Sequence, residues 1–262
     1  MYNEALKIME FTMHHDDWNQ HWEDFSKVSL ANPVNQYRAR LILEKIPDSA
    51  SHILDIGCGQ GWLVSQLLQH HENAIISGVD ISEKGIIYAK KKNPKANFFQ
   101  MDLLNPPQNL PAFLHKNIDT AICTEVLEHV DDPVTFLKNI KTLLKPDAAL
   151  IITVPGGIQS SYDKYLGHRR HYTKKSLTQL LHAADFKIEK IWQGGFPFFN
   201  LYKLLVTLRG KKIVEDAKQT EFTLPFKLLL KLFSFLFHFN LSHSYFGWQL
   251  IAVAKNNPIL DE

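Results

Sequence analysis

The chain carries an acid followed by three alternating glycines, the pattern D-x-G-x-G-x-G, at Asp55, Gly57, Gly59 and Gly61. Glycine adopts backbone conformations with positive φ and lets a ligand approach the main chain without a Cβ in the way. A helix expected at 60–71 would point free N–H groups into this turn. Asp80 ends the next apolar run about 20 residues further on, where a carboxylate usually holds ribose hydroxyls. These residues predict a nucleoside-binding crevice at the ends of parallel strands.

The spacing of the glycines narrows the chemistry of the ligand. A dinucleotide-binding turn has the spacing G-x-G-x-x-G, with its third glycine placed for helix packing around a pyrophosphate. The spacing here is G-x-G-x-G, and the preceding Asp55 would repel a pyrophosphate but suits a cationic ligand. A nicotinamide-dependent oxidoreductase is therefore disfavoured, and a glycine turn without any ligand is the remaining alternative.

Composition sets the class of protein and disfavours several partners. The chain has 262 residues, enough for one large or two small domains with a sizeable core. Its net charge of +2 gives no electrostatic reason to expect a nucleic-acid partner. The two cysteines, Cys58 and Cys123, predict neither a disulfide scaffold nor a zinc site. Residues 1–22 contain no apolar signal-peptide core, so we expect a cytoplasmic protein.

From about residue 51 short apolar runs alternate with helical stretches, which is typical of a parallel sheet covered on both faces. We expect strands at 52–56, 74–79, 97–101, 118–123, 149–154, 186–192 and 248–254. We expect helices at 32–46, 60–71, 82–92, 133–144 and 174–184. Pro133 suits the first turn of its helix, and Ser82 is a candidate N-cap. The fold class is therefore α/β.

With these motifs in order, the chain resembles the class I S-adenosylmethionine-dependent methyltransferases over roughly residues 32–155. The resemblance implies a Rossmann-like, doubly wound sheet of seven strands whose last strand is inserted antiparallel. It implies S-adenosyl-L-methionine as the cofactor, a ligand with an amino acid moiety and a sulfonium. Relatives that methylate nucleic-acid bases have Pro-Pro and an aromatic residue after the fourth strand, and residues 124–127 (Thr-Glu-Val-Leu) do not match them.

The family's motifs map onto cofactor-binding candidates at the ends of four expected strands. The resemblance implies that the glycine turn meets the methionine part and that Asp80 accepts both ribose hydroxyls. It further implies that Ile81 lies against adenine, with Asp102 at its exocyclic amine. The full set is Asp55, Gly57, Cys58, Gly59, Gly61, Asp80, Ile81, Met101, Asp102, Leu103, Thr124 and Glu125, joined by Tyr37 and Arg40 of the leading helix. An ordinary covering role for that helix is an equal alternative.

The run E-V-L-E-H ends the fourth expected strand and contains Glu125, Glu128 and His129. It resembles the ubiquinone-biosynthesis O-methyltransferase branch, in which a cation has been assigned to this place, and carboxylate and imidazole suit a divalent ion. Because Glu128 and His129 are adjacent, their side chains need not point the same way, and we expect no metal. His129 is instead a candidate base or substrate contact, with a hydrogen bond at the start of a helix as the alternative.

A loop rich in titratable and aromatic groups follows the fifth expected strand, at residues 160–173. Loops at this rim normally face the acceptor. Its end, G-H-R-R-H-Y-T, resembles small-molecule methyltransferases of sugar and natural-product pathways. His168 and His171 are candidate general bases for an oxygen acceptor, since histidine titrates near neutral pH. Substrate-contact candidates are Tyr162, Arg170, Tyr172 and Phe196, and either Arg169 or Arg170 could hold an anionic acceptor with two hydrogen bonds. A helix cap formed by residues 172 and 173 and solvated arginines at 169 and 170 are the alternatives.

Two apolar helical stretches separate the last two expected strands, at 194–209 and 224–239. This insertion of about 55 residues is much longer than ordinary loops. Lysines in the second stretch disfavour a membrane span, so a lid over an apolar substrate, a homodimer face or a peripheral membrane contact through residues 224–241 remain. We favour the lid. The expected domains are an N-terminal helical cap (1–50), the cofactor-binding core (51–192), the lid insertion (193–247), and the last strand and tail (248–262).

The sequence predicts a methyltransferase that moves a methyl group from S-adenosyl-L-methionine to a small apolar or anionic acceptor, most readily at oxygen. A quinone, natural product or sugar or lipid intermediate fits that description. Methylation at nitrogen or carbon is an alternative, because the motifs specify the donor far better than the acceptor. A cofactor-binding protein of the same fold that no longer transfers methyl groups is the other.

Overall fold

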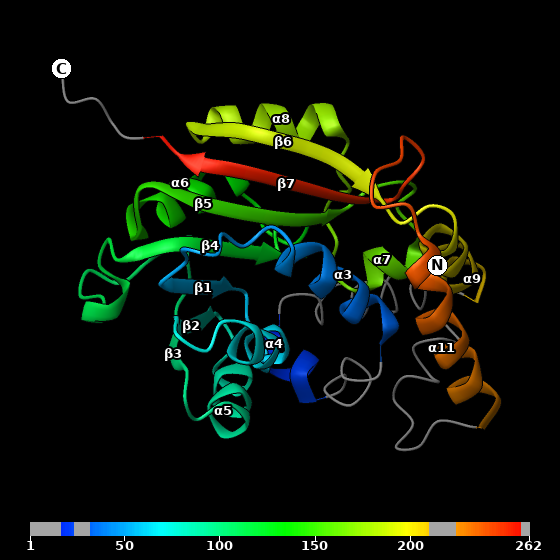
Figure 1. Ribbon diagram of the computed structural model, residues 1–262, viewed down its shortest axis with the longest axis horizontal. Coiled ribbons are helices and arrows are strands. Elements are labelled where there is room, and N and C mark those ends of the chain that lie inside the picture. The colour runs from blue at the N-terminus through cyan, green and yellow to red at the C-terminus, as the bar shows by residue number, and fades with distance from the viewer. Residues whose placement is uncertain (1–16, 24–31, 210–223, 258–262) are drawn as a thin grey trace, which may run out of the picture.

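The computed structural model describes residues 17–23, 32–209 and 224–257, which are built around one seven-stranded sheet (Figure 1). The strand order is β3-β2-β1-β4-β5-β7-β6, and only β7 runs antiparallel to its neighbours. The strands are β1 (His52–Ile56), β2 (Ile75–Asp80), β3 (Asn97–Gln100), β4 (Ile118–Thr124), β5 (Leu144–Pro155), β6 (Phe186–Gly194) and β7 (Gln249–Asn256). The predicted Rossmann-like α/β sheet, with an inserted antiparallel last strand, is confirmed.

Helices cover both faces of this sheet, because alternate residues of each strand point to opposite sides. Ile53 of β1 belongs to the core beneath α3, α4 and α5, while the adjacent Leu54 belongs to the core beneath α6 and α8. The helices around the sheet are α3 (Pro33–Leu43), α4 (Trp62–His70), α5 (Glu83–Lys92), α6 (Pro133–Leu143), α7 (Ser161–Tyr165) and α8 (Lys174–Ala183), with a 3₁₀ turn η1 (Ala112–Leu114).

The helix starts follow from local capping chemistry. The Ser82 hydroxyl accepts the Gly85 N–H at 3.0 Å and begins α5, and the Asp132 carboxylate accepts the Thr135 N–H at 3.1 Å before Pro133 of α6. Asn32 caps α3 in the same way by accepting the Val34 N–H. The expected elements agree with the observed ones to within a few residues at most ends.

The insertion between β6 and β7 is helical, as predicted. It contains α9 (Phe198–Arg209), α11 (Leu224–Leu236) and the 3₁₀ turn η2 (Phe237–Phe239). Its inner face carries Phe199, Phe233 and Phe237, which pack on α3 and on the sheet in a third hydrophobic cluster. Figure 1 places α9 and α11 together at one end of the molecule.

The strand order reverses between β1 and β4, since β1 leads outward to β2 and β3 on one side while β4 leads to β5 on the other. At such a switch point the loops after the strands diverge and leave a crevice at the carboxyl ends. The fold therefore brings together the segments after β1, β2, β3 and β4, which hold most of the predicted cofactor residues.

Candidate active site

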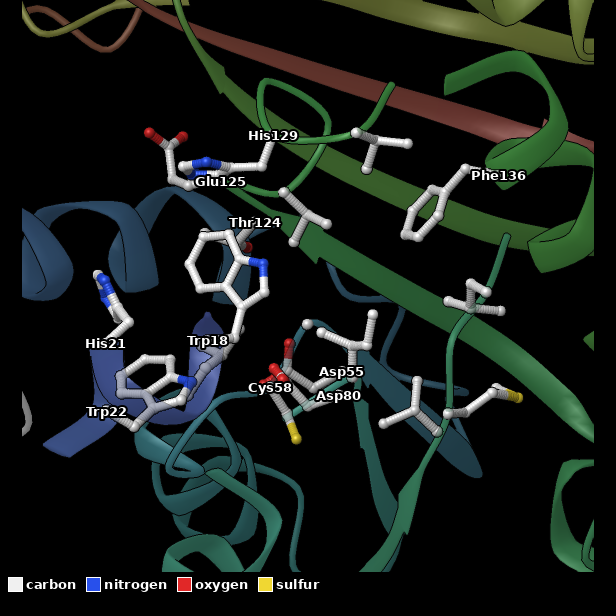
Figure 2. A pocket seen from close by; sticks show the side chains of 18 of the residues that line it. Trp18, His21, Trp22, Asp55, Cys58, Asp80, Thr124, Glu125, His129 and Phe136 are labelled. Atoms are coloured by element: carbon white, nitrogen blue, oxygen red, sulfur yellow. The ribbon is translucent and has the colours of Figure 1, made fainter. Parts of the chain in front are cut away.

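A cavity of about 450 Å³ lies at this switch point and is lined by the segments that follow β1 to β4, by α3 and by a short helical segment at residues 18–23 (Figure 2). Among the predicted cofactor residues, ten line it: Asp55, Gly57, Cys58, Asp80, Ile81, Met101, Asp102, Leu103, Thr124 and Glu125. Gly59 and Gly61 do not line it, but they shape the turn that does.

The glycine turn depends on backbone conformations that favour glycine. Gly57, Gly59 and Gly61 all have positive φ, at 72°, 50° and 73°. A Cβ on Gly57 would also lie 2.4 Å from the Val126 side chain. The Asp80 carboxylate accepts the Gly59 N–H at 2.7 Å and the Ser82 N–H at 2.8 Å, so it ties the turn to the end of β2.

Two buried carboxylates, Asp55 and Asp80, face the cavity next to each other (Figure 2). Burial raises the pKa of both carboxyls, and the charge of Asp80 raises the pKa of Asp55 further. Buried charges of like sign are costly unless a cation or hydrogen-bond donors offset them. In the described residues, no lysine or arginine pairs with either one. The pair therefore suits a ligand that is cationic and carries hydroxyl groups.

The far end of the cavity is formed by the segment after β3. Met101 and Leu103 are buried and present apolar surface, and Ile81 contributes from the end of β2. The Asp102 carboxylate accepts the Leu104 N–H and an Asn105 side-chain N–H, both at 2.8 Å, which fixes its orientation at the cavity wall. An apolar slot with one fixed carboxylate suits a flat heterocycle that carries an amine.

Glu125 follows β4 with a φ of 54°, unusual for a residue that is not glycine. Its carboxylate accepts a hydrogen bond from Arg38 of α3 at 2.5 Å, from Gln249 of β7 at 2.8 Å and from Thr153 of β5 at 3.1 Å. Three elements thus hold one carboxylate at the cavity, and Arg38 offsets its charge.

A histidine cluster forms the other end of the cavity. His129 and His168 both line it, and their ring centroids are 4.7 Å apart in an edge-to-face arrangement. His168 Nδ1 lies 3.2 Å from Nε2 of His171, which lies behind it and 3.8 Å from the Asp163 carboxylate. Burial and then the neighbouring His129 lower the pKa of His168 to about 2, and burial also lowers the pKa of His171. Both rings are therefore neutral near pH 7.

Asp163 and Glu128 lie next to this cluster with opposite protonation preferences. Burial raises the pKa of Asp163, but the Lys203 ammonium, which donates to it at 2.7 Å, and the Ser160 groups outweigh this and hold the pKa at about 2. Glu128 is fully buried, and neither carboxyl oxygen has a hydrogen-bond partner in the described part of the chain. Burial, followed by the Glu125 charge, raises the pKa of Glu128 well above its usual value.

Comparison with known proteins identifies the family. A methyltransferase domain matches residues 30–191, more than half of the chain. The chain belongs to the methyltransferase-domain family. This membership confirms the resemblance to the S-adenosylmethionine-dependent methyltransferases and, with it, the predicted cofactor. The buried carboxylates and the apolar slot fit a ligand with a sulfonium, ribose hydroxyls and adenine.

This methyltransferase-domain chain is similar to several proteins of known sequence or structure. It is 31% identical over 162 residues to the ubiquinone biosynthesis O-methyltransferase of Coxiella burnetii, covering 61% of this chain and 64% of that protein, slightly less than two thirds of its length. A possible histamine N-methyltransferase from Thermotoga maritima superposes with a TM-score of 0.60 at 17% identity, covering 92% of this chain and all of that one. A [4+2]-cyclase, SpnF, superposes with a TM-score of 0.55 at 18% identity, covering 84% and 80%. The two structures show the shared fold.

The methyltransferase structure departs from the predicted contacts of α3. Asn35, Arg38, Ala39 and Ile42 line the cavity, which is the helical spacing of one face. Tyr37 and Arg40 lie on another face, where the Tyr37 ring packs 5.8 Å from that of Phe199 and Arg40 donates to the Phe237 carbonyl at 3.2 Å. Those two residues contact the insertion and do not line the cavity. The face of α3 that lines the cavity is the one that carries the apolar residues Ala39 and Ile42.

The predicted acceptor contacts also differ from the observed wall. None of Tyr162, Arg170, Tyr172 and Phe196 lines the cavity. The Tyr172 hydroxyl donates to the Leu127 carbonyl at 3.0 Å, and Arg170 donates to the Asp131 carbonyl at 3.1 Å, so both serve the loop itself. The neighbouring Arg169 lines the cavity instead, where it pairs with Asp131 and donates to the His129 carbonyl.

The three residues considered for a cation separate into two groups. Glu125 pairs with Arg38, whereas Glu128 and His129 lie with His168 so that one ligand atom of each falls within 4.8 Å of the others. A second such group joins His168 and His171 to Asp163, but Lys203 already neutralises that carboxylate. The absence of a metal stays a prediction.

The sequence interpretation missed the aromatic segment at residues 18–23. Trp18, His21 and Trp22 line the cavity (Figure 2), and the Trp18 and His129 rings meet edge to face with centroids 4.8 Å apart. A Cβ on Gly59 would overlap the Trp22 ring, so the middle glycine of the turn makes room for this indole. The available signal was the spacing of the two tryptophans, four residues apart and thus on one helical face.

Proposed function

We propose that this protein transfers the methyl group of S-adenosyl-L-methionine to an oxygen atom of a small apolar or anionic acceptor. The observation that carries the proposal is a single cavity with two buried carboxylates, Asp55 and Asp80, at one end and two histidines, His129 and His168, at the other. One end suits the cationic donor, and the other can take a proton from an acceptor.

The donor half binds and orients. S-adenosyl-L-methionine supplies an electrophilic methyl group on its sulfonium. In the proposal, Asp80 accepts the ribose hydroxyls while Asp55 and the turn at Gly57 face the methionine part. Ile81, Met101 and Leu103 pack around adenine, with Asp102 near its amine. Methyl transfer is an in-line displacement, so much of the rate enhancement comes from this positioning.

The acceptor half removes a proton. An oxygen acceptor with a high pKa must lose its proton as it attacks, and a neutral imidazole at hydrogen-bond distance can accept it. His129 and His168 are the two histidines of the described cluster that line the cavity, and His171 stands behind His168 at 3.2 Å. The ionised Asp163 is 3.8 Å from His171 and would stabilise a proton that reached that ring. We assign the base to His129 or His168 and a supporting role to His171.

The acceptor walls are mainly apolar. Val126, Val130, Phe136 and Leu166 are among the apolar residues that line the cavity, and the Trp18 ring contacts His129. This favours an acceptor with a hydrocarbon or aromatic body, and the name of the O-methyltransferase relative supports transfer to an oxygen atom. The boundaries of the helical cap, core and insertion predicted above, and the cytoplasmic location, are part of the proposal.

Calorimetric titration with S-adenosylhomocysteine, with NAD as the parallel control, tests the donor half. We expect micromolar binding of the former and none of the latter. Transfer of a tritium-labelled methyl group into quinols, lipids and sugars then tests the acceptor half. Cofactor binding without any labelled product would support a protein that has lost methyl transfer, and label on nitrogen or carbon would overturn the oxygen assignment.

A further inference from the structure

The helical insertion exposes an apolar surface that the proposed reaction does not use. Along α11 and η2, one row of side chains points to solvent: Leu224, Leu228, Leu232, Phe235 and Phe239, each between 51% and 70% exposed. Their spacing of three or four residues puts them on one helical face. Along α9, Leu201, Leu204, Leu205 and Leu208 form a second exposed row. Two neighbouring rows of exposed apolar side chains such as these indicate an interaction surface.

This outer surface is distinct from the inner face of the same helices. Phe199, Phe233 and Phe237 are buried against α3 and the sheet, so the fold already uses one apolar face of the insertion. A surface helix normally has one apolar face and one polar face. In the structure, no residue of the described insertion lines the cavity, and the lid role of the insertion stays a prediction.

The charge around the apolar row indicates what covers it. Lys227 and Lys231 are exposed on α11 directly beside the row, and neither forms an ion pair within the described residues. In the described parts of the insertion, residues 193–209 and 224–247, there are four lysines and arginines and no aspartate or glutamate. A protein partner of ordinary mixed charge does not require this bias, whereas anionic lipid headgroups above an acyl layer match both features.

The dimensions of the helix fit a position flat on a bilayer. No helix in the described chain is long and apolar enough to cross a membrane. α11 has 13 residues and is therefore about 20 Å long, shorter than the roughly 30 Å hydrocarbon core. A short amphipathic helix with aromatic and leucine side chains on one side and lysines at the border lies in the interface instead.

We propose that α9 and α11 dock this protein onto an anionic lipid surface. The insertion also contacts the acceptor end of the site, because Lys203 of α9 donates to Asp163 beside the histidine cluster. Docking would therefore bring the acceptor half close to molecules dissolved in the bilayer. The proposal itself does not depend on methyl transfer.

Sedimentation with vesicles tests the docking surface on the full-length protein. One set of vesicles contains phosphatidylcholine alone, and the other contains phosphatidylcholine with about 30% phosphatidylglycerol, whose negative surface potential attracts basic segments. We expect binding to the anionic set that weakens at high salt, since exposed charges are screened. The affinity of the double variant Leu228→Glu/Phe235→Glu for the anionic vesicles should be at least about tenfold lower than that of the wild type. Ile87→Glu on α5, where Ile87 is 54% exposed, is the matched control and should bind like the wild type.

Two further measurements make the outcome decisive. All three proteins should bind S-adenosylhomocysteine equally, which shows that the variants are folded and separates this test from that of the proposed function. The reversal Lys227→Glu/Lys231→Glu should remove the preference for anionic vesicles. Equal binding by the Leu228→Glu/Phe235→Glu variant, no binding by the wild type, or a lipid-free dimer that this variant dissociates would each overturn the proposal, the last in favour of a second copy.

Discussion

The two ends of the cavity are built in different ways. The donor end comes from residues at or just after strand ends, held by main-chain hydrogen bonds such as those from Gly59 and Ser82 to Asp80. The histidine end comes mostly from loops, and its order depends on side-chain contacts among His129, His168 and His171. Strand ends are positioned by the sheet ladder, so their chemistry is set by local sequence, whereas a loop site requires partners from distant segments.

The largest effect should come from the loop-built end. Replacing His168 by alanine removes a candidate proton acceptor but leaves the donor end intact. We expect turnover with a methylated acceptor to fall about 100-fold, within the range of general-base catalysis, while the Kd for S-adenosylhomocysteine changes less than about threefold. His129→Ala separates the two candidates, and the variant with the larger loss identifies the base. Normal turnover in both variants would remove the histidines from the mechanism.

The strand-built end should show the opposite pattern. Asp80→Asn keeps the size of the side chain but removes the charge that we propose accepts the ribose hydroxyls. Hydrogen bonds to a charged group contribute about 1.5–3 kcal/mol, so the Kd for S-adenosylhomocysteine should rise at least about tenfold by calorimetry. Asp119→Asn is the matched control, because that carboxylate binds the Ser51 backbone away from the cavity. An unchanged affinity in Asp80→Asn would contradict the ribose assignment.

The difference between the two ends also explains which parts of the fold and of the site could be predicted from the sequence. The seven strands and most of the donor-end residues were predictable, because a glycine turn and an acid at a strand end are local signals whose geometry the sheet completes. Tyr37 and Arg40 do not line the cavity and contact the insertion, so their cofactor contact stays a prediction. In sequence, Val34, Tyr37, Leu41 and Ile42 form one helical stripe. In the structure the first three pack with the insertion, whereas Ile42 packs in the core against the sheet, and periodicity alone does not distinguish these two surroundings.

The residues at the histidine end of the cavity could not be predicted in the same way. Arg170 and its neighbour Arg169 look alike in sequence and both donate to Asp131 from another loop, but only Arg169 lines the cavity. The Trp18 and Trp22 rings meet His129 and the glycine turn, which are far from them in sequence, and Arg38 becomes significant only because Glu125 meets it. Contacts between segments far apart in sequence decide these positions.

Lowering the pH should destabilise the fold through the histidine end. Burial lowers the pKa of His168 to about 2 from an unfolded value near 6.5, so below pH 6.5 the unfolded state binds more protons than the native state. The free energy of unfolding therefore falls as pH decreases below 6.5, by about 1 kcal/mol per pH unit from this residue. Urea unfolding of the wild type and of His168→Gln at pH 7 and pH 5.5 measures this loss in the free energy of unfolding. His168→Gln should lose less stability than the wild type between these two pH values. The control is His182→Gln, at an exposed histidine of α8, which should lose as much stability as the wild type.

The smallest effect should come from Trp18, which lies where the two ends meet. Its ring lines the cavity and contacts His129 edge to face, so it belongs to the wall of both halves. Trp18→Leu keeps an apolar side chain but removes the ring contact, which is worth about 0.5–1.5 kcal/mol. We therefore expect both the Kd for S-adenosylhomocysteine and the turnover to worsen by about two- to tenfold. Tyr88→Leu on α5 is the control, since Tyr88 is 40% exposed and does not line the cavity. A change in only one of the two quantities would show that Trp18 serves that end alone, and the two ends would then be independent.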